Sequence, residues 1–318
     1  MHTAGRAAIL LSLTACQTDP GPAQKYFVYV EADTEADTAA DTDTSQPDTG
    51  PPPLVLVDPQ HTLVGGWGHS CELQTTGKVQ CWGRNSHGQG SSPQGRFASI
   101  SAGHLHNCGL KQSGQLQCWG NNSDGETDPP TGAFVSVDTA ADFSCALNAE
   151  GNISCWGGLN RYDELRPLTG RFAQVHAGWF HGCAMTESGE IECWGWDAFG
   201  QASPPRGEFV SMGLGYWHGC AIDQAEELQC WGSDDYGQSS SPEGRFSAVV
   251  AGEFHTCGLR TSGEVVCWGW DIELQSQPPS GRFSTIATGG IHSLALDAEG
   301  QPSCWGSNQF GQCDAPPE

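Results

Sequence analysis

Histidine recurs at one fixed place in this chain, two residues before a repeated cysteine position. Imidazole nitrogens are common ligands of transition metals, and residues two apart on a strand point to the same face, so the pattern could hold a metal ion for hydrolysis. Phe143 takes this place in one unit, where it would interrupt a ring of ligands without harming packing. We therefore expect these residues to form hydrogen bonds within their own units, and to bind no metal. The histidines are His69, His106, His181, His218, His255 and His292.

Fifteen cysteines give the chain a second chemistry, disulfide formation in an oxidising compartment. Cys71 and Cys81 flank the stretch Thr75-Thr76-Gly77, which is typical of a three-residue hairpin loop with glycine in the left-handed conformation. This loop places the two cysteines opposite each other, at a Cα separation of about 4.5 to 5.5 Å that suits a disulfide. Six such bridges are predicted: Cys71–Cys81, Cys108–Cys118, Cys145–Cys155, Cys183–Cys193, Cys220–Cys230 and Cys257–Cys267. Cys304 either pairs with Cys313 or stays a free thiol.

The cysteine pairs belong to a unit that occurs seven times. Cys-Trp-Gly closes each unit, and successive copies lie 37 residues apart, except for one step of 38 between Cys155 and Cys193. Proline and glycine mark the joints, a phenylalanine such as Phe97 begins the next short alternating run, and no segment has a sustained helical period. An all-β repeat array is therefore predicted. Its repeated tryptophans are expected to pack between units: Trp82, Trp119, Trp156, Trp194, Trp231, Trp268 and Trp305.

One unit shows the repeated motif most clearly, as Ala-Gly-x-x-His-x-Cys-x-Leu over residues 102–110, followed by Leu116, Cys118, Trp119, Gly120, Asn121 and Gly125. The motif resembles the repeat of the regulator of chromosome condensation family. This resemblance implies a seven-bladed β-propeller, in which seven 37-residue repeats complete one ring. The short step is similar to exported bacterial members, including a secreted β-lactamase inhibitor propeller. The nucleotide-exchange activity of the nuclear member is not expected, because short repeats leave no room for a long inserted loop.

The units differ from one another at two places, and large aromatic residues gather at both. One place lies between Ala-Gly and the histidine, and the other follows Trp-Gly. The strand directions put both loops on one rim, opposite the hairpin loops. Because aromatic residues at variable loop positions are typical interface anchors, we predict a partner-binding rim. Its residues are Trp67, Trp179, Phe180, Tyr216, Trp217, Phe254, Trp196, Phe199, Tyr236 and Trp270. The expected partner is a protein, and a glycan stacked on the same rings is the alternative.

The first sixteen residues have the pattern of a secretory signal, with a positive charge at Arg6 and an apolar run to Leu13. The ending Leu-Thr-Ala-Cys resembles the bacterial lipobox, which implies lipidation of Cys16 and an outer-membrane or cell-surface location. Residues 17–53 are rich in Asp, Thr and Pro and are predicted to form a disordered acidic tether. The propeller is predicted over 54–318, with 54–57 as its first inner strand. How the first and last blades close is left open.

Acidic residues dominate the chain, with 37 Asp and Glu against 13 Lys and Arg and a formal net charge of −24. DNA and RNA would be repelled, so nucleic acid is not an expected partner. The sequence has no nucleophile elbow, metalloprotease helix motif, phosphate loop or dinucleotide fingerprint. We therefore predict a monomeric, non-catalytic binding module without a cofactor, held at the membrane only by its lipid anchor.

Overall fold

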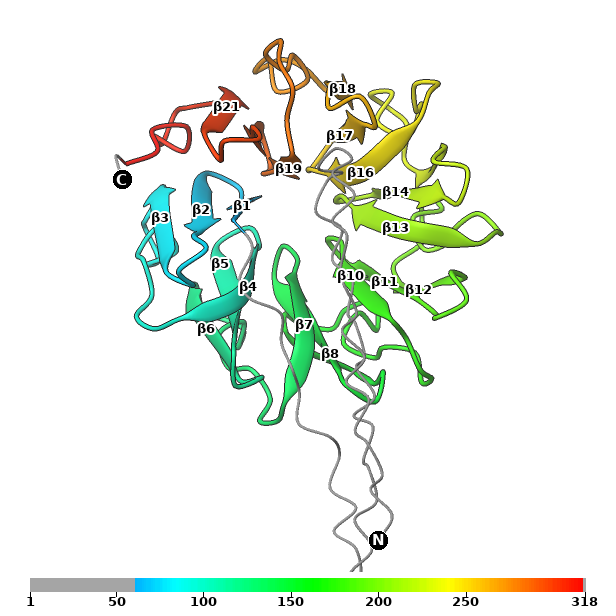
Figure 1. Cartoon of the computed structure of the whole chain (residues 1–318). Helices are drawn as coiled ribbons and strands as arrows, with labels where there is room; N and C mark the ends of the chain where they lie inside the picture. The colour runs from blue at the N-terminus through cyan, green and yellow to red at the C-terminus, as the bar shows by residue number, and fades with distance from the viewer. Residues whose placement is uncertain (1–60, 317–318) are drawn as a thin grey trace, which may run out of the picture.

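Seven three-stranded antiparallel sheets form a ring in the computed structural model, which describes residues 61–316 (Figure 1). Each sheet, or blade, is one contiguous repeat whose strands pair in chain order. The predicted all-β seven-bladed propeller is confirmed. The predicted signal, lipidation site and tether lie outside the described residues. In the described part of the chain, no helix has the length and apolar character needed to cross a membrane.

Three sets of strands build the blades, and the inner set surrounds the ring axis (Figure 1). The inner strands are β1 (Thr62–Gly65), β4 (Phe97–Ala102), β7 (Phe134–Thr139), β10 (Gln174–Ala177), β13 (Phe209–Leu214), β16 (Phe246–Ala251) and β19 (Thr285–Thr288). The middle strands are β2 (His69–Leu73), β5 (His106–Lys111), β8 (Phe143–Asn148), β11 (His181–Met185), β14 (His218–Asp223), β17 (His255–Arg260) and β20 (His292–Leu296). The outer strands are β3 (Val79–Gly83), β6 (Leu116–Gly120), β9 (Ile153–Gly157), β12 (Ile191–Gly195), β15 (Leu228–Gly232), β18 (Val265–Gly269) and β21 (Pro302–Gly306). In the described residues the inner strand of the first blade is β1, and the predicted stretch over 54–57 lies outside them.

The predicted hairpin register is confirmed in the first blade. The Gln74 amide donates to the Lys78 carbonyl at 2.9 Å, and Gly77 closes the loop at φ +78°. Cys71 lies opposite Cys81 between β2 and β3. The six predicted disulfides form in this way, each with a sequence separation of ten residues. Cys304 pairs with Cys313, which settles the alternative that the sequence left open.

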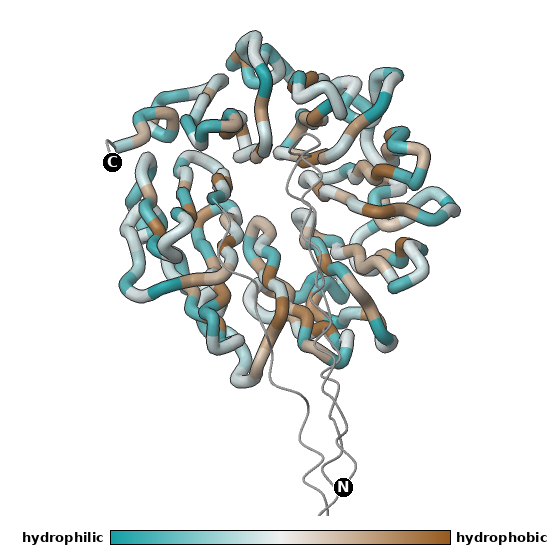
Figure 2. The backbone as a smooth tube through the Cα atoms, viewed as in Figure 1, coloured by the Kyte–Doolittle hydropathy of each residue, from teal (hydrophilic) through white to brown (hydrophobic). Residues whose placement is uncertain are grey.

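The apolar core is divided into seven clusters, each shared by two neighbouring blades. Figure 2 shows hydrophobic residues distributed around the whole ring. In one of them, Leu73 of the first blade packs with Phe97 and Ile100 of the second. In another, Leu294 and Leu296 of the last blade pack with Leu63 and Trp82 of the first. The ring therefore closes by the same packing that joins its other blades.

A hydrogen bond accompanies this packing at most blade joints. Each loop after an outer strand contains a buried Gln or Glu, and at six of the seven joints its backbone carbonyl accepts the indole N–H of the next blade's repeated tryptophan. Trp156 bonds to Glu126 at 3.0 Å, for example, and Trp194 bonds to Glu164 at 2.9 Å. The predicted packing of these tryptophans between units is confirmed. Trp119 makes no such bond, and the corresponding carbonyl of Gln89 accepts a hydrogen bond from the Asn107 side chain at 3.0 Å.

Candidate partner-binding face

The two variable loops of a blade meet at one edge. In the fourth blade the Trp196 amide donates to the Phe180 carbonyl, and in the sixth the Trp270 amide donates to the Phe254 carbonyl, both at 2.8 Å. These bonds join the start of the middle strand to the end of the outer strand. The hairpin loop lies at the other end of the same two strands. Both variable loops therefore occupy one rim, as the strand directions predicted.

Aromatic rings from the third to the sixth blade form a continuous contact network on this rim, which we call the aromatic face. Trp179 stacks on Trp217 with 5.6 Å between ring centroids and an interplanar angle of 7°. Trp217 contacts Phe254 at 5.2 Å, and Phe254 contacts Trp270 at 5.9 Å. The aromatic face consists of Tyr162, Trp179, Phe180, Trp196, Phe199, Tyr216, Trp217, Tyr236, Phe254 and Trp270. It brings together every predicted rim residue except Trp67.

Exposed aliphatic side chains extend the aromatic face. Ile272 is 74% exposed and Leu274 57% exposed in the sixth blade, and Leu159 is 58% exposed in the third. All three lie in loops that follow outer strands, as do the exposed rings of Tyr162, Phe199 and Tyr236. The sequence reasoning missed these aliphatic residues because it considered only aromatic ones. Large apolar residues in otherwise polar loops are the signal that would have found them.

The same loops are polar in the first two blades. They carry Arg84, Asn85 and Ser86 in the first blade, and Asn121 and Asn122 in the second. The Asn85 and Asn122 side chains form hydrogen bonds within their own loops. The apolar surface is therefore one-sided and covers an arc of the rim.

Trp67 belongs to a second, smaller group beside the ring axis. Its ring lies 5.1 Å from that of His104 and 5.5 Å from that of Phe310, and the Arg84 guanidinium lies 4.6 Å from its centroid. The His104 ring lies 6.4 Å from Tyr216 of the aromatic face. The two groups thus meet at the axis of the propeller.

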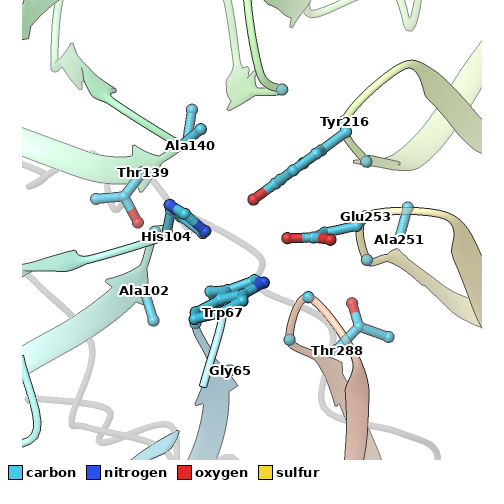
Figure 3. Close-up of a pocket in the computed structure, with 18 of the residues that line it drawn as sticks. Gly65, Trp67, Ala102, His104, Thr139, Ala140, Tyr216, Ala251, Glu253 and Thr288 are labelled. Carbon is cyan, nitrogen blue, oxygen red and sulfur yellow. The ribbon is translucent and has the colours of Figure 1, made fainter. Parts of the chain in front are cut away.

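A cavity of about 80 Å³ lies at this axis and opens on the same rim. We call this cavity the channel mouth. The ends of the inner strands line it, together with the first variable residue of several blades, namely Trp67, His104, Ala141, Tyr216, Glu253 and Gly290. Figure 3 shows the Tyr216 hydroxyl and the Glu253 carboxylate pointing toward His104 and Trp67. The sequence reasoning did not select His104 or Glu253, because these residues come together only when the ring closes.

Burial controls the charges at the channel mouth. It raises the pKa of Glu253, which the facing Tyr216 hydroxyl partly opposes. Burial and the Glu253 carboxylate raise the pKa of Tyr216 well above its usual value. Burial, with the nearby Arg84 charge, lowers the pKa of His104 to about 4, so this ring is neutral at pH 7. Burial also raises the pKa of Asp142, reinforced by the Glu126 carboxylate.

The repeated histidines connect neighbouring blades. The Nε2 atom of His106 lies 2.8 Å from Ser144 Oγ of the next blade, and that of His292 lies 2.8 Å from Ser70 Oγ, across the ring closure. The expectation of bonds within each histidine's own unit is therefore wrong. His181 faces Gly219 in this position, and neither of its ring nitrogens has a hydrogen-bond partner. Among residues 61–316, no three His, Cys, Asp or Glu side chains are grouped to hold a metal ion.

The repeat pattern and the fold are both similar to those of known proteins. The model of the "Regulator of chromosome condensation (RCC1) repeat" matches residues 61–89, 97–126, 172–201, 209–238 and 246–273. The ectodomain of the Physcomitrella patens receptor kinase CR4 is similar at 27% identity and a TM-score of 0.67, over 77% of this chain and 73% of that one. The ectodomain of the Arabidopsis thaliana receptor kinase ACR4 is similar at 26% identity and a TM-score of 0.67, over 77% and 94%.

A third similar structure shares the fold alone. Prp20p from Saccharomyces cerevisiae aligns at 16% identity and a TM-score of 0.65, over 75% of this chain and 83% of that one. No curated protein matches the chain. The matched ranges leave out the units that carry Phe143 and Leu294, the two that depart from the repeated His and Cys positions.

Proposed function

From the premise that this chain carries repeats of the regulator of chromosome condensation family, we propose that it is an exported, non-catalytic binding module that holds a protein partner on its aromatic face. The observation that carries the proposal is the exposure of large apolar side chains on one arc of one rim. Contiguous exposed apolar surface is costly for a soluble protein and typically marks an interaction site. Tyr and Trp are also the residues that most often dominate the energetics of protein interfaces.

The packing of the rings favours a protein over a glycan. A sugar stacks on the open face of an aromatic ring, but Trp179 lies parallel to both Phe180 and Trp217, at centroid distances of 5.1 and 5.6 Å. The exposed apolar groups also include aliphatic side chains such as Ile272 and Leu274, on which a sugar cannot stack. A mixed surface of this kind suits apolar side chains of a folded partner.

Export is supported by the disulfides and by the similar structures. Seven disulfides form and persist in an oxidising compartment. The two receptor-kinase structures that are similar at 26–27% identity are ectodomains. We include in the proposal a monomeric propeller, of the short-repeat exported bacterial type, that is lipid-anchored through Cys16 at the outer membrane or cell surface.

The test compares partner binding by matched surface variants of the full chain. Tyr162, Phe199, Tyr236 and Ile272 are exposed, so their joint replacement by serine removes apolar contact area with little effect on folding. The control is Val210→Ser, because Val210 is 43% exposed but lies beside the hairpin loops on the opposite rim. A protein captured from envelope extracts by the parent chain is purified, and its Kd is measured with each variant.

We expect the fourfold variant to weaken binding by about a hundredfold or more, since interface anchors contribute roughly 1 to 2 kcal/mol each and do not add fully. The Val210→Ser control should bind like the parent. Equal affinity of the fourfold variant and the control would reject the aromatic face as the site. Competition by free saccharides, together with loss of binding after deglycosylation of the partner, would favour the glycan alternative.

A further inference from the structure

Glu253 is a buried carboxyl group that lacks a cationic partner among residues 61–316. It is 8% exposed, and its carboxylate points into the channel mouth (Figure 3). Burial of an ionised carboxylate without an opposite charge is unfavourable. The binding of a cation in the cavity would therefore stabilise the charged form of this group.

A glycine lets Glu253 and Trp67 pack closely against the wall of the cavity. Gly290 occupies the position where other blades place Trp67, His104, Tyr216 or Glu253. A Cβ atom added to Gly290 would lie 2.7 Å from Trp67 Cδ1 and 2.8 Å from Glu253 Oε1. Only a residue without a side chain fits at this position, so Gly290 lets the indole edge and the carboxylate oxygen lie side by side in the channel mouth.

Aromatic rings form the rest of the wall. The cavity is surrounded by Trp67, Tyr216 and the neutral ring of His104. Behind Tyr216 lies Trp179, with 4.6 Å between the two ring centroids. The Tyr216 hydroxyl points into the cavity, and it and the neutral His104 ring can each accept a hydrogen bond from an ammonium group. Two nearby charges act on a cation in the cavity. The Arg84 guanidinium opposes its binding, whereas the partly buried Asp142 carboxylate favours it.

The size of the cavity limits what can enter. Its volume of about 80 Å³ is far below the roughly 300 to 1,000 Å³ of ordinary ligand sites, so it accepts the end of one side chain. A lysine ammonium is a compact charge with three donors, whereas a guanidinium is a wide planar fork. The cavity therefore suits lysine better than arginine.

We propose that the channel mouth binds a primary ammonium group, and that this group is a lysine side chain of the protein held on the adjacent aromatic face. Only the origin of the lysine rests on the proposed function. The acidic character of the chain, with a formal net charge of −24, also favours a partner that presents basic residues. Glu253 would accept the ammonium hydrogen bond while the rings of Trp67 and Tyr216 enclose it.

The probe that tests the pocket is Nα-acetyl-lysine methylamide, with its Nε-acetylated form as the uncharged match. Binding to the full chain is followed by NMR of alanine methyl groups, because Ala141 and Ala251 line the cavity. We expect saturable shifts of these two methyl groups with the charged probe only. Glu253→Gln keeps the shape of the side chain and should weaken binding roughly tenfold or more, because a neutral amide oxygen accepts a weaker hydrogen bond from an ammonium group than a carboxylate does.

Two further variants separate the pocket from general effects of charge and folding. Gly290→Ala places a methyl group against Trp67 and Glu253, so it should displace these side chains and block the probe without changing any charge. An unchanged methyl spectrum elsewhere shows that the propeller is intact. Glu187→Gln, in an exposed hairpin loop on the opposite rim, should bind the probe like the parent. Equal binding of both probes, or full binding by Glu253→Gln, would overturn the pocket. If the fourfold variant binds the partner as well as its control does while the parent still binds the probe, the pocket stands and only a lysine of a partner on the aromatic face is rejected as its occupant.

Discussion

The indole N–H of Trp82 donates to the backbone carbonyl of Gln312 at 2.8 Å, although the two residues are 230 positions apart. Ser70 Oγ donates to the same carbonyl at 2.9 Å. The first blade is therefore fastened to a loop that follows the last outer strand. The Cys304–Cys313 disulfide ties that loop to its own blade, next to Gln312. This disulfide stabilises the closure of the ring, whereas the other six lie within hairpins.

Replacing Cys304 and Cys313 together by alanine should loosen the ring closure. We expect the free energy of unfolding to fall by about 2 to 3 kcal/mol. Amide hydrogen exchange should become faster in the first blade, which depends on the loop for the Trp82 contact. The matched control replaces Cys145 and Cys155, which should lower stability without faster exchange in β1 to β3. Equal exchange in both variants would contradict the role given to the Cys304–Cys313 bridge.

His181→Phe should stabilise the protein, by about 1 kcal/mol. The wild-type imidazole is buried opposite Gly219 and leaves both ring nitrogens without partners. The third blade shows the alternative, because Phe143 faces the corresponding Gly182 of the next blade. In contrast, His106→Phe should cost roughly 1 to 3 kcal/mol, because it leaves the buried Ser144 hydroxyl unbonded. Urea unfolding of the two variants measures both changes in the free energy of unfolding. Changes of the same sign would refute the argument that these histidines stabilise the fold only where the next blade offers a hydrogen-bond partner.

Stability should fall as the pH drops below about 6.5. Burial lowers the pKa of His69, His181 and His255 to about 4, and that of His106, His218 and His292 to about 3. The unfolded chain, with histidine pKa values near 6.5, binds these protons first, so the contribution is complete above pH 6.5 and is lost toward pH 3 to 4. Each histidine contributes up to about 1.4 kcal/mol per pH unit.

Urea midpoints measured between pH 7.5 and 4.5 check this expectation. His181→Phe should reduce the slope by the equivalent of one proton, since one titrating group is removed. A stability that does not change over this range would show that the buried histidines take up protons in the folded protein.

Glu226→Gly should stabilise the fifth blade by about 0.5 to 1 kcal/mol. Glu226 adopts φ +67° in its hairpin loop, where the other blades have glycine, such as Gly77 and Gly263. The strain of a left-handed residue exceeds the entropy that glycine adds to the unfolded chain. The ion pair lost with Arg245 is largely exposed and contributes little. Gly263→Glu is the reciprocal control and should destabilise; a gain in stability there would invalidate the argument.

The fold was predictable because the residues that determine the hairpin loop and its register lie within a single repeat. Gly77 defines the hairpin loop, and the register of that loop brings Cys71 opposite Cys81. Because Trp-Gly recurs seven times, the sequence then implies one ring in which neighbouring blades pack in the same way. Bonds between blades were harder to predict. The partner of His106 is Ser144, which is 38 residues away, so a search within one unit could not find it.

The rim was predictable as a location, and its composition only in part. Strand direction placed Trp217 and Trp270 on the same side without knowledge of the ring's curvature. The group formed by Trp67, His104, Tyr216 and Glu253 depends on residues from four blades meeting across the axis. The spacing of residues in the sequence does not predict these contacts, because it does not determine how close each loop comes to the ring axis.

Site-specific photo-crosslinking in the producing cell tests the central claim most directly. A photoreactive phenylalanine derivative replaces Tyr236, which is 52% exposed on the aromatic face, and in a parallel strain replaces Val210 on the opposite rim. The account predicts one dominant crosslinked protein from position 236 that is absent from position 210. Crosslinks of equal strength and identity from both positions, or none from position 236 while position 210 yields a partner, would contradict it.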